Sequence, residues 1–156
     1  EIREHLEAAQ NPVFFYDNDA DGLCSYVLLR KFIDRGKGVA IRTHPDVDVG
    51  YVRKIQELNA DYVFVLDRPY LGQEFVEEVK KMQVPIVWID HHDTEKVNYG
   101  YDNLFYYNPM NGRKKSAEPI TYWSYRIANR VEDVWIAVMG CIAAHHFPDF
   151  SYPMFL

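Results

Sequence analysis

Residues 14–25, FFYDNDADGLCS, join an aromatic and apolar run to three aspartates at alternate positions, then to a glycine and a second apolar segment. The residues before Asp17 are apolar throughout, as in a buried strand. The segment after Gly22 carries apolar residues at helical spacing and ends near Gly36, a typical helix C-terminal signal. The stretch is therefore predicted to form a strand, an acidic turn and a helix.

The pattern of Asp17, Asp19, Asp21 and Gly22 also matches the first half of a calcium-binding EF-hand loop. An EF-hand needs a bidentate glutamate at the twelfth loop position and a helix before the loop. The twelfth position here is Leu28, and the preceding segment has the pattern of a strand. The sequence therefore argues against an EF-hand, and the three carboxylates need another explanation.

The composition is that of an ordinary globular domain. The chain has 156 residues, of which 48% are hydrophobic and 26% charged, and this length suits one domain with a real core. It contains neither a membrane-length apolar run nor the apolar core of a signal peptide, so we expect a cytoplasmic protein. Cys24 and Cys141 are isolated and make neither a disulfide framework nor a zinc pattern.

The ends of the chain and its charge bear on what surrounds this domain. The first residue is not methionine, and the last stretch ends on large apolar side chains. We therefore expect residues 1–156 to be one domain of a longer protein. The net charge of -6 would normally disfavour a nucleic-acid partner. Divalent cations bound among the acids would offset part of this charge, so such a partner is not excluded.

Strand and helix patterns alternate along the rest of the chain. Apolar segments typical of strands lie at residues 38–43, 61–67, 85–90 and 104–108, and helical patterns at 51–58, 73–82, 120–129 and 132–146. Apolar strands separated by helices indicate a parallel sheet covered on both faces. The predicted fold is α/β, a Rossmann-like three-layer domain with a mainly parallel five-stranded sheet.

Three of the predicted strands end in aspartate, at Asp17, Asp67 and Asp90, and the last is followed by His91 and His92. Ligands of an open parallel sheet bind outside the carboxyl ends of its strands, so these side chains should converge at one edge. A single aspartate at such a position would equally well cap a helix or begin a turn. Three of them with two adjacent histidines favour a functional site.

Several carboxylates in a small space repel one another unless cations lie between them. Carboxylates with imidazoles favour manganese, iron, cobalt or zinc over magnesium alone. Two ions about 4 Å apart with a bridging carboxylate activate a bound water and neutralise a phosphate under attack. The predicted chemistry is phosphoester hydrolysis with two divalent ions, Mn²⁺ in first place and Mg²⁺ or Co²⁺ as alternatives.

The motifs, in this order, resemble the DHH phosphoesterase superfamily. DNDADG at residues 17–22, the aspartate of VLDRP and DHH at residues 90–92 are similar to its first three motifs, and the resemblance spans about residues 11–146. The D-x-D-x-D-G form resembles the RecJ-like single-strand exonucleases, including archaeal forms associated with DNA replication and DNA repair. Oligonucleotide and cyclic-dinucleotide phosphodiesterases and family II pyrophosphatases usually differ at this motif.

The resemblance implies a manganese-dependent nuclease acting on single-stranded DNA or RNA, and it implies metal-binding roles. Asp19 and Asp21 would each bind a metal, and Asp67 would bridge the two ions. His91 would be a further ligand, and Asp17 would support the cluster. A C-terminal domain outside residues 1–156 would hold the strand, and replication or repair proteins would be partners.

The resemblance also implies residues that act on substrate. Asp90 would orient the histidines, and His92 would contact the scissile phosphate, a role that suits a hydrogen-bond donor. Arg68, next to a proposed ligand, is a further candidate phosphate contact. Arg113 and Lys114, in the basic segment NGRKKS, are candidates for binding a phosphodiester backbone, although a solvated loop fits that segment equally well.

The chain departs from the family at the fourth motif. There a glycine is followed four residues later by a metal-binding aspartate, whereas here Gly140 is followed by Ala144. Asp149 lies too far along to replace it, and His145 and His146 have the pattern of a helix end. The chain is either a naturally weakened member or one silenced by substitution, and we favour the second because every other ligand is intact.

Two alternatives remain open at the level of function. One is an oligoribonuclease or dinucleotide phosphodiesterase, which would share the same metal chemistry. The other is a non-catalytic replisome scaffold or binding module. Ala144 supports the scaffold, whereas the intact acidic motifs oppose it, because a scaffold does not need a cluster of mutually repelling acids.

Overall fold

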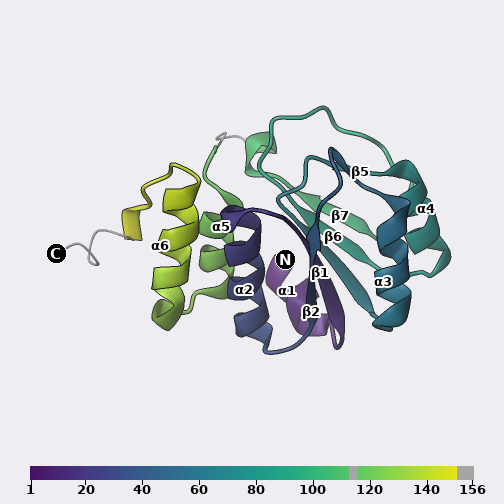
Figure 1. The fold of residues 1–156 in the computed structure, drawn as a ribbon, viewed down its shortest axis with the longest axis horizontal. Helices are drawn as coiled ribbons and strands as arrows, with labels where there is room; N and C mark the ends of the chain where they lie inside the picture. The colour runs from purple at the N-terminus through teal and green to yellow at the C-terminus, as the bar shows by residue number, and fades with distance from the viewer. Residues whose placement is uncertain (113–115, 151–156) are drawn as a thin grey trace.

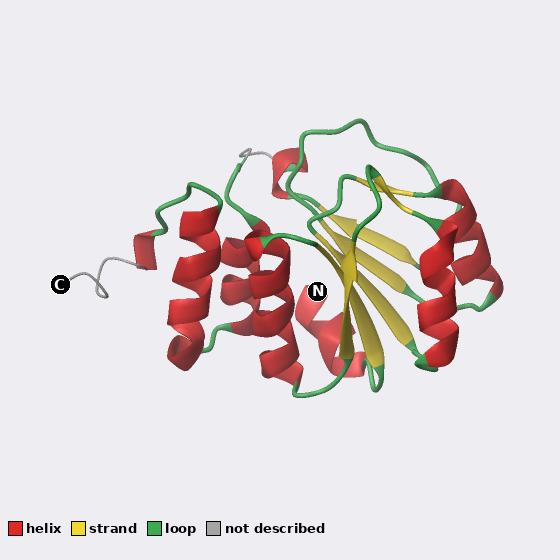
Figure 2. Ribbon diagram, in the orientation of Figure 1, coloured by secondary structure: helices red, strands yellow, loops and turns green. Residues whose placement is uncertain are grey.

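The computed structural model describes residues 1–112 and 116–150 and shows a parallel sheet between two layers of helices (Figures 1 and 2). In spatial order the strands are β2 (Lys37–Ile41), β1 (Pro12–Asp17), β4 (Tyr62–Leu66), β6 (Ile86–Ile89) and β7 (Leu104–Tyr107). All neighbouring strands are parallel. The predicted α/β class and five-stranded sheet are confirmed.

Helices cover both faces of the sheet because its strands are apolar on both sides. The helices are α1 (Ile2–Ala8), α2 (Ala20–Ile33) and α5 (Ile120–Ala128) on one face, α3 (Val52–Glu57) and α4 (Gln73–Lys81) on the other, and α6 (Val134–Ala143) outside α2 and α5 (Figure 1). In β1, Phe14 packs in the core with Leu29 of α2, whereas Phe15 meets Phe75 of α4. None of the described helices is long and apolar enough to cross a membrane.

Some elements of the structure differ from the sequence-based prediction. The sequence pattern missed α1 and a parallel pair of two-residue strands, β3 (Asp46–Val47) and β5 (Tyr70–Leu71). The last predicted helix, at residues 132–146, begins only at Val134 and ends at Ala143. The single-turn elements η1 (Val49–Tyr51), η2 (Pro109–Asn111) and η3 (Val131–Asp133) were also missed. Elements of two or three residues are too short to show a period.

The register of the sheet aligns the residues that follow β1, β4 and β6. Tyr16 is paired with Leu66, and Leu66 is paired with Ile89. Each of these three residues is followed in the chain by an aspartate. Asp17, Asp67 and Asp90 therefore form one row at the carboxyl edge of three adjacent strands. This row is the base of the candidate site.

Candidate metal centre

The turn between β1 and α2 holds two aspartates close together. The Asp19 side chain caps α2 by accepting a hydrogen bond of 2.8 Å from the Gly22 amide, and the Asp19 amide donates to the Asp17 carbonyl at 2.9 Å. A Cβ atom at Gly22 would lie 2.2 Å from the Asp17 carbonyl oxygen, so a side chain there would clash with the backbone. The glycine therefore lets the first turn of α2 approach the end of β1.

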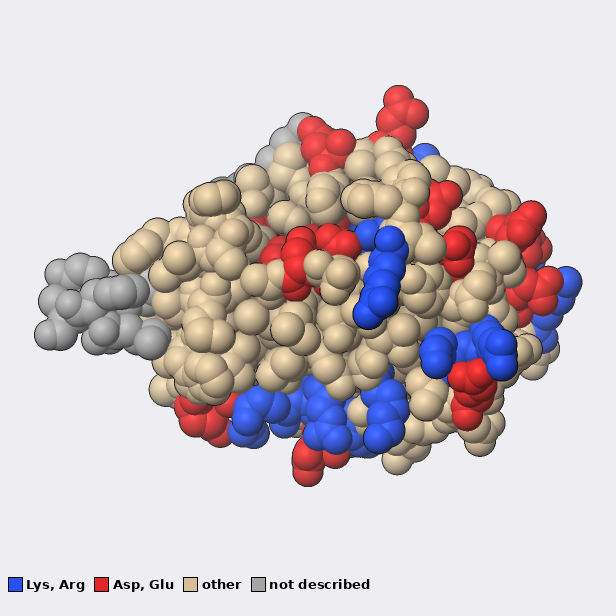
Figure 3. Space-filling model, in the orientation of Figure 1, with Lys and Arg blue, Asp and Glu red and all other residues tan. Residues whose placement is uncertain are grey.

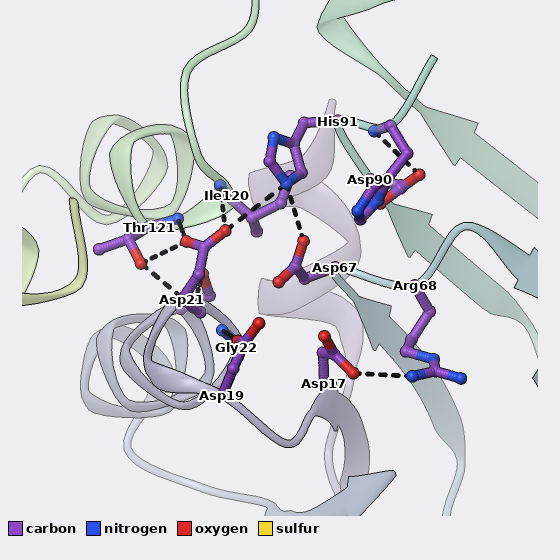
Figure 4. A network of polar contacts seen from close by, with 12 residues as sticks. Asp17, Asp19, Asp21, Gly22, Asp67, Arg68, Asp90, His91, Ile120 and Thr121 are labelled. Atoms are coloured by element: carbon purple, nitrogen blue, oxygen red, sulfur yellow. Dashed lines mark hydrogen bonds and ion pairs between the residues drawn. The ribbon is translucent and has the colours of Figure 1, made fainter. Parts of the chain in front are cut away.

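Asp67 enters the site from a left-handed backbone position directly after β4. Its φ of 64° is uncommon for a residue other than glycine. The turn is held by the Asp67 amide, which donates to the Ile89 carbonyl at 2.9 Å, and by the Trp88 indole, which donates to the Arg68 carbonyl at 2.7 Å. These bonds place the Asp67 carboxylate in the centre of Figure 4, where the residue is only 2% exposed.

Within residues 1–112 and 116–150, the possible metal ligands form two groups that share Asp67. One ligand atom each from Asp17, Asp19 and Asp67 lies within 4.8 Å of the other two, and the same holds for Asp67, His91 and His92. Acidic side chains gather above the end of β1 and the first turn of α2 in the space-filling view (Figure 3). This arrangement suits two cations side by side with Asp67 between them.

The surroundings of Asp67 fit a divalent cation. Its Oδ1 is buried and accepts no hydrogen bond from the described residues. His91 Nε2 lies 2.9 Å from this oxygen, at ion-pair distance but without hydrogen-bond alignment. A divalent cation between these two side chains would replace the proton that His91 holds near this oxygen.

The acids and histidines of the site perturb one another. Burial raises the pKa of the Asp67 carboxyl to about 7, and it also raises the pKa of Asp19. Burial alone would lower the pKa of His91, but its contact with Asp67 and the charges of Asp21 and Asp90 outweigh this and raise the pKa to about 9. Without a cation the cluster therefore retains protons that a metal ion would displace.

Asp90 and Asn108 fix the orientation of His92. Asp90 is fully buried, with Oδ1 2.7 Å from His92 Nδ1 and Oδ2 accepting from the His92 amide at 3.2 Å. The Asn108 side chain donates to the His92 carbonyl at 2.8 Å. The bond to Asp90 raises the pKa of His92. Because Nδ1 is engaged, Nε2 is the ring nitrogen left for other contacts.

Asp21 is bound to the start of α5. Its Oδ1 accepts from the Thr121 amide at 2.7 Å and the Thr121 hydroxyl at 2.6 Å, and its Oδ2 accepts from the Ile120 amide at 3.2 Å (Figure 4). Oδ2 also lies 3.7 Å from His91 Nε2. The structure therefore brings Asp17, rather than Asp21, into the group with Asp19 and Asp67. Thr121 was missed because its contact with Asp21 spans 100 positions and leaves no local signal.

Arg68 differs from the sequence-based expectation, whereas the structure does not test the basic segment. The Arg68 side chain is 1% exposed, with Nη1 2.7 Å from Asp17 Oδ1 and Nη2 donating to the Thr43 carbonyl after β2. Its guanidinium is thus an internal partner of Asp17 and has no surface to offer to a phosphate. Arg113 and Lys114 lie outside the described residues.

Ala144 lies at the end of α6 that is nearer to the site. Lys31, in the last turn of α2, pairs with Asp133 before α6 at 3.4 Å. At the other end, a Cβ atom on Gly140 would lie 2.7 Å from Cys24 Cβ in the first turns of α2. α6 therefore runs antiparallel to α2, and exposed Ala144, one turn beyond Gly140, is level with the acidic turn.

Comparisons with known proteins identify the family and support the fold. The model of the DHH family, N-terminal domain, matches residues 13–144. No curated protein matches the chain in sequence. RecJ with Mn²⁺ from Thermus thermophilus is similar with a TM-score of 0.66 and 18% identity, over 93% of this chain and 23% of that one. Exonuclease RecJ bound to manganese has a TM-score of 0.67 and 18% identity, over 92% of this chain and 41% of that one. An exopolyphosphatase-related protein from Bacteroides fragilis has a TM-score of 0.52 and 14% identity, over 94% of this chain and 47% of that one. The chain thus spans less than half the length of each.

Proposed function

Because the chain belongs to the DHH family, whose N-terminal domain it matches over residues 13–144, we propose that it is the catalytic domain of a metal-dependent phosphoesterase. The proposed reaction is hydrolysis of single-stranded nucleic acid from an end. The observation that carries the proposal is the position of Asp67 in both groups of ligand atoms. The likeness of the chain's fold to two RecJ structures that contain manganese supports Mn²⁺ as the metal.

Two groups of residues would hold the metal ions. Asp17, Asp19 and Asp67 form the first, and Asp67 with His91 forms the second, in which His92 is a further possible ligand. Carboxylates mixed with imidazoles suit Mn²⁺ better than Mg²⁺ alone. When bound, a pair of such ions supplies an activated water and neutralises charge on the phosphate. Arg68, itself buried, keeps the Asp17 carboxylate in place through their ion pair.

We assign His92 to contact with the phosphate. Its alternative role is that of a metal ligand in the second group. With Nδ1 held by Asp90, Nε2 is free to donate a hydrogen bond to a phosphoryl oxygen or to the leaving oxygen. The bond to Asp90 raises the pKa of His92, which favours the protonated, donating form. Asp90 thereby acts through His92 as a positioning residue.

In this proposal Ala144 weakens the metal site, because its side chain has no carboxylate. An aspartate at this position would extend from α6 toward the acidic turn and add a carboxylate to the cluster. We therefore expect the chain as it stands to bind metal less tightly than an Ala144→Asp variant, and to cleave substrate slowly or not at all.

End-labelled single-stranded DNA and RNA, incubated with and without Mn²⁺, test the proposed function. The chain is compared with its Ala144→Asp variant, and Ala143→Asp serves as a control that adds the same charge one residue away. We expect manganese-dependent release of short products with Ala144→Asp and little with the other two proteins.

The products separate the alternatives. Cleavage of dinucleotides and very short RNA alone would favour the oligoribonuclease. If Ala144→Asp cuts none of these substrates while it binds a strand, the catalytic proposal is wrong and the scaffold replaces it.

A further inference from the structure

A cavity of about 580 Å³ opens beside the metal centre, at the carboxyl end of the edge strand β7. Its wall is apolar and aromatic, with Tyr107 from β7, Trp123 and Ile127 from α5, and Ile89 from β6. The volume is in the range of pockets that hold small ligands. No role in metal binding requires these residues.

The cavity adjoins the residues that we assign to the phosphate. Asn108 lines it and also donates to the His92 carbonyl at 2.8 Å. Ile89 lines it and is followed directly by Asp90. The cavity therefore borders the main chain that carries Asp90 and His92.

The polar side chains of the cavity are neutral or positively charged. Exposed Lys96 adds a positive charge to the lining, and Asn111 adds an amide. No described lining residue is acidic, although the chain carries a net charge of -6. The lining therefore favours an aromatic ligand that carries a phosphate.

We propose, on the basis of the proposed function, that this cavity is a subsite for the base of the nucleotide next to the phosphate under attack. A nucleobase is flat and aromatic, so it can pack against Tyr107 and Trp123 as bases do on aromatic side chains. Its polar edge can pair with the Asn111 amide, which lines the cavity. Lys96 attracts the backbone phosphate at the rim.

Binding of dAMP to the chain in the presence of Mn²⁺, measured by isothermal calorimetry, tests this subsite. 2-Deoxyribose 5-phosphate is the matched ligand without a base, and AMP tests whether the subsite also takes a ribonucleotide. Ile127→Trp fills the cavity, Trp123→Phe reduces its aromatic wall, and Trp135→Phe, on the exposed face of α6, is the control.

We expect dAMP to bind roughly tenfold more tightly than the sugar phosphate. Ile127→Trp should weaken dAMP roughly tenfold and Trp123→Phe roughly fivefold, with no change in Trp135→Phe. Equal binding of dAMP and the sugar phosphate, absence of dAMP binding, or dAMP affinity unchanged in both cavity variants would overturn the subsite. Manganese binding and strand cleavage, measured on the same proteins, report separately on the proposed function.

Discussion

Asp67 shows how much of the site depends on the conformation of a single residue. Its left-handed backbone turns the chain immediately after β4, and its amide is tied to β6 through the Ile89 carbonyl. The carboxylate that results is buried, has its Oδ1 2.9 Å from His91 Nε2 and belongs to both groups of ligand atoms. The sequence indicates an aspartate at a strand end, but neither the left-handed turn nor the contact with His91 has a local signal.

Thr121 gives a test at the same scale. Thr121→Val removes the hydroxyl that donates to Asp21 at 2.6 Å and keeps the shape of the side chain. Because Asp21 Oδ2 lies 3.7 Å from Nε2 of the candidate ligand His91, we expect a loosened Asp21 to disturb His91 and to weaken Mn²⁺ binding roughly tenfold. The free energy of unfolding should fall by about 1–2 kcal/mol through the lost buried hydrogen bond. Calorimetry and urea denaturation measure the two quantities.

Thr121→Ser is the matched control for this prediction, because it retains the hydroxyl. It should restore most of the metal affinity that Thr121→Val loses. If Thr121→Val binds Mn²⁺ as tightly as the unmodified chain, Thr121 has only a structural role and Asp21 does not need to be held.

The raised pKa values of Asp67 and His91 predict how pH acts on the metal-free protein. A folded-state pKa above the unfolded value stabilises the protein at low pH, and this stability is lost as pH rises through the folded pKa. For Asp67 the loss runs from about pH 4 to about 7, and for His91 from about pH 6.5 to about 9. We therefore expect the Tm of the metal-free chain to fall from about pH 5 to about pH 9.

Added Mn²⁺ should oppose the fall in Tm with rising pH, because protons no longer compete for the ligands at high pH. The Tm increase caused by Mn²⁺ should be larger at about pH 8.5 than at about pH 5.5. His91→Gln should flatten the metal-free dependence above about pH 7. A metal-free Tm that rises with pH, or a manganese effect that is the same at both pH values, would contradict the assignment of these two residues.

At the scale of elements, the contact of α6 with α2 and α5 depends on Gly140. A Cβ atom there would lie 2.5 Å from Thr121 Oγ1 and 2.7 Å from Cys24 Cβ. Gly to Ala in a helix ordinarily stabilises by about 1 kcal/mol, so the sign of the effect is diagnostic. We expect Gly140→Ala to destabilise the protein by about 1–3 kcal/mol through overpacking, as measured by urea denaturation.

Met139→Ala is the control for this prediction, because Met139 lies next to Gly140 on the exposed face of α6 and is 54% exposed. It should change the free energy of unfolding by less than about 0.5 kcal/mol. Stabilisation by Gly140→Ala would show that α6 is not packed closely against Thr121.

The elements themselves were largely predictable, because the strands of the sheet are apolar on both faces and the intervening helices are periodic. Contacts between elements were not. Arg68 follows a candidate ligand, and the sequence suggested a phosphate contact, yet its side chain turns inward to Asp17. Asp21 matches a family motif, yet its carboxylate is held by α5. In both cases the deciding partner comes from a distant segment.

At the scale of the whole molecule, parallel strand order brings the acids together. Because β1, β4 and β6 are neighbours in register, Asp17, Asp67 and Asp90 meet at one edge without any proximity in sequence. This convergence follows from a parallel sheet and was predictable. The cavity next to it was not, because α1, α5, β6 and β7 all contribute to its lining.

Titration of Mn²⁺ into the metal-free chain by isothermal calorimetry tests the central claim, that Asp67 joins two metal positions. Asp67→Asn is compared with Asp93→Asn, an exposed acid beside the histidines that belongs to neither group. The account predicts two bound ions in the chain and in Asp93→Asn, and loss of both in Asp67→Asn, with each fold checked by circular dichroism. Absence of Mn²⁺ binding to the chain, or unchanged binding in Asp67→Asn, would contradict it.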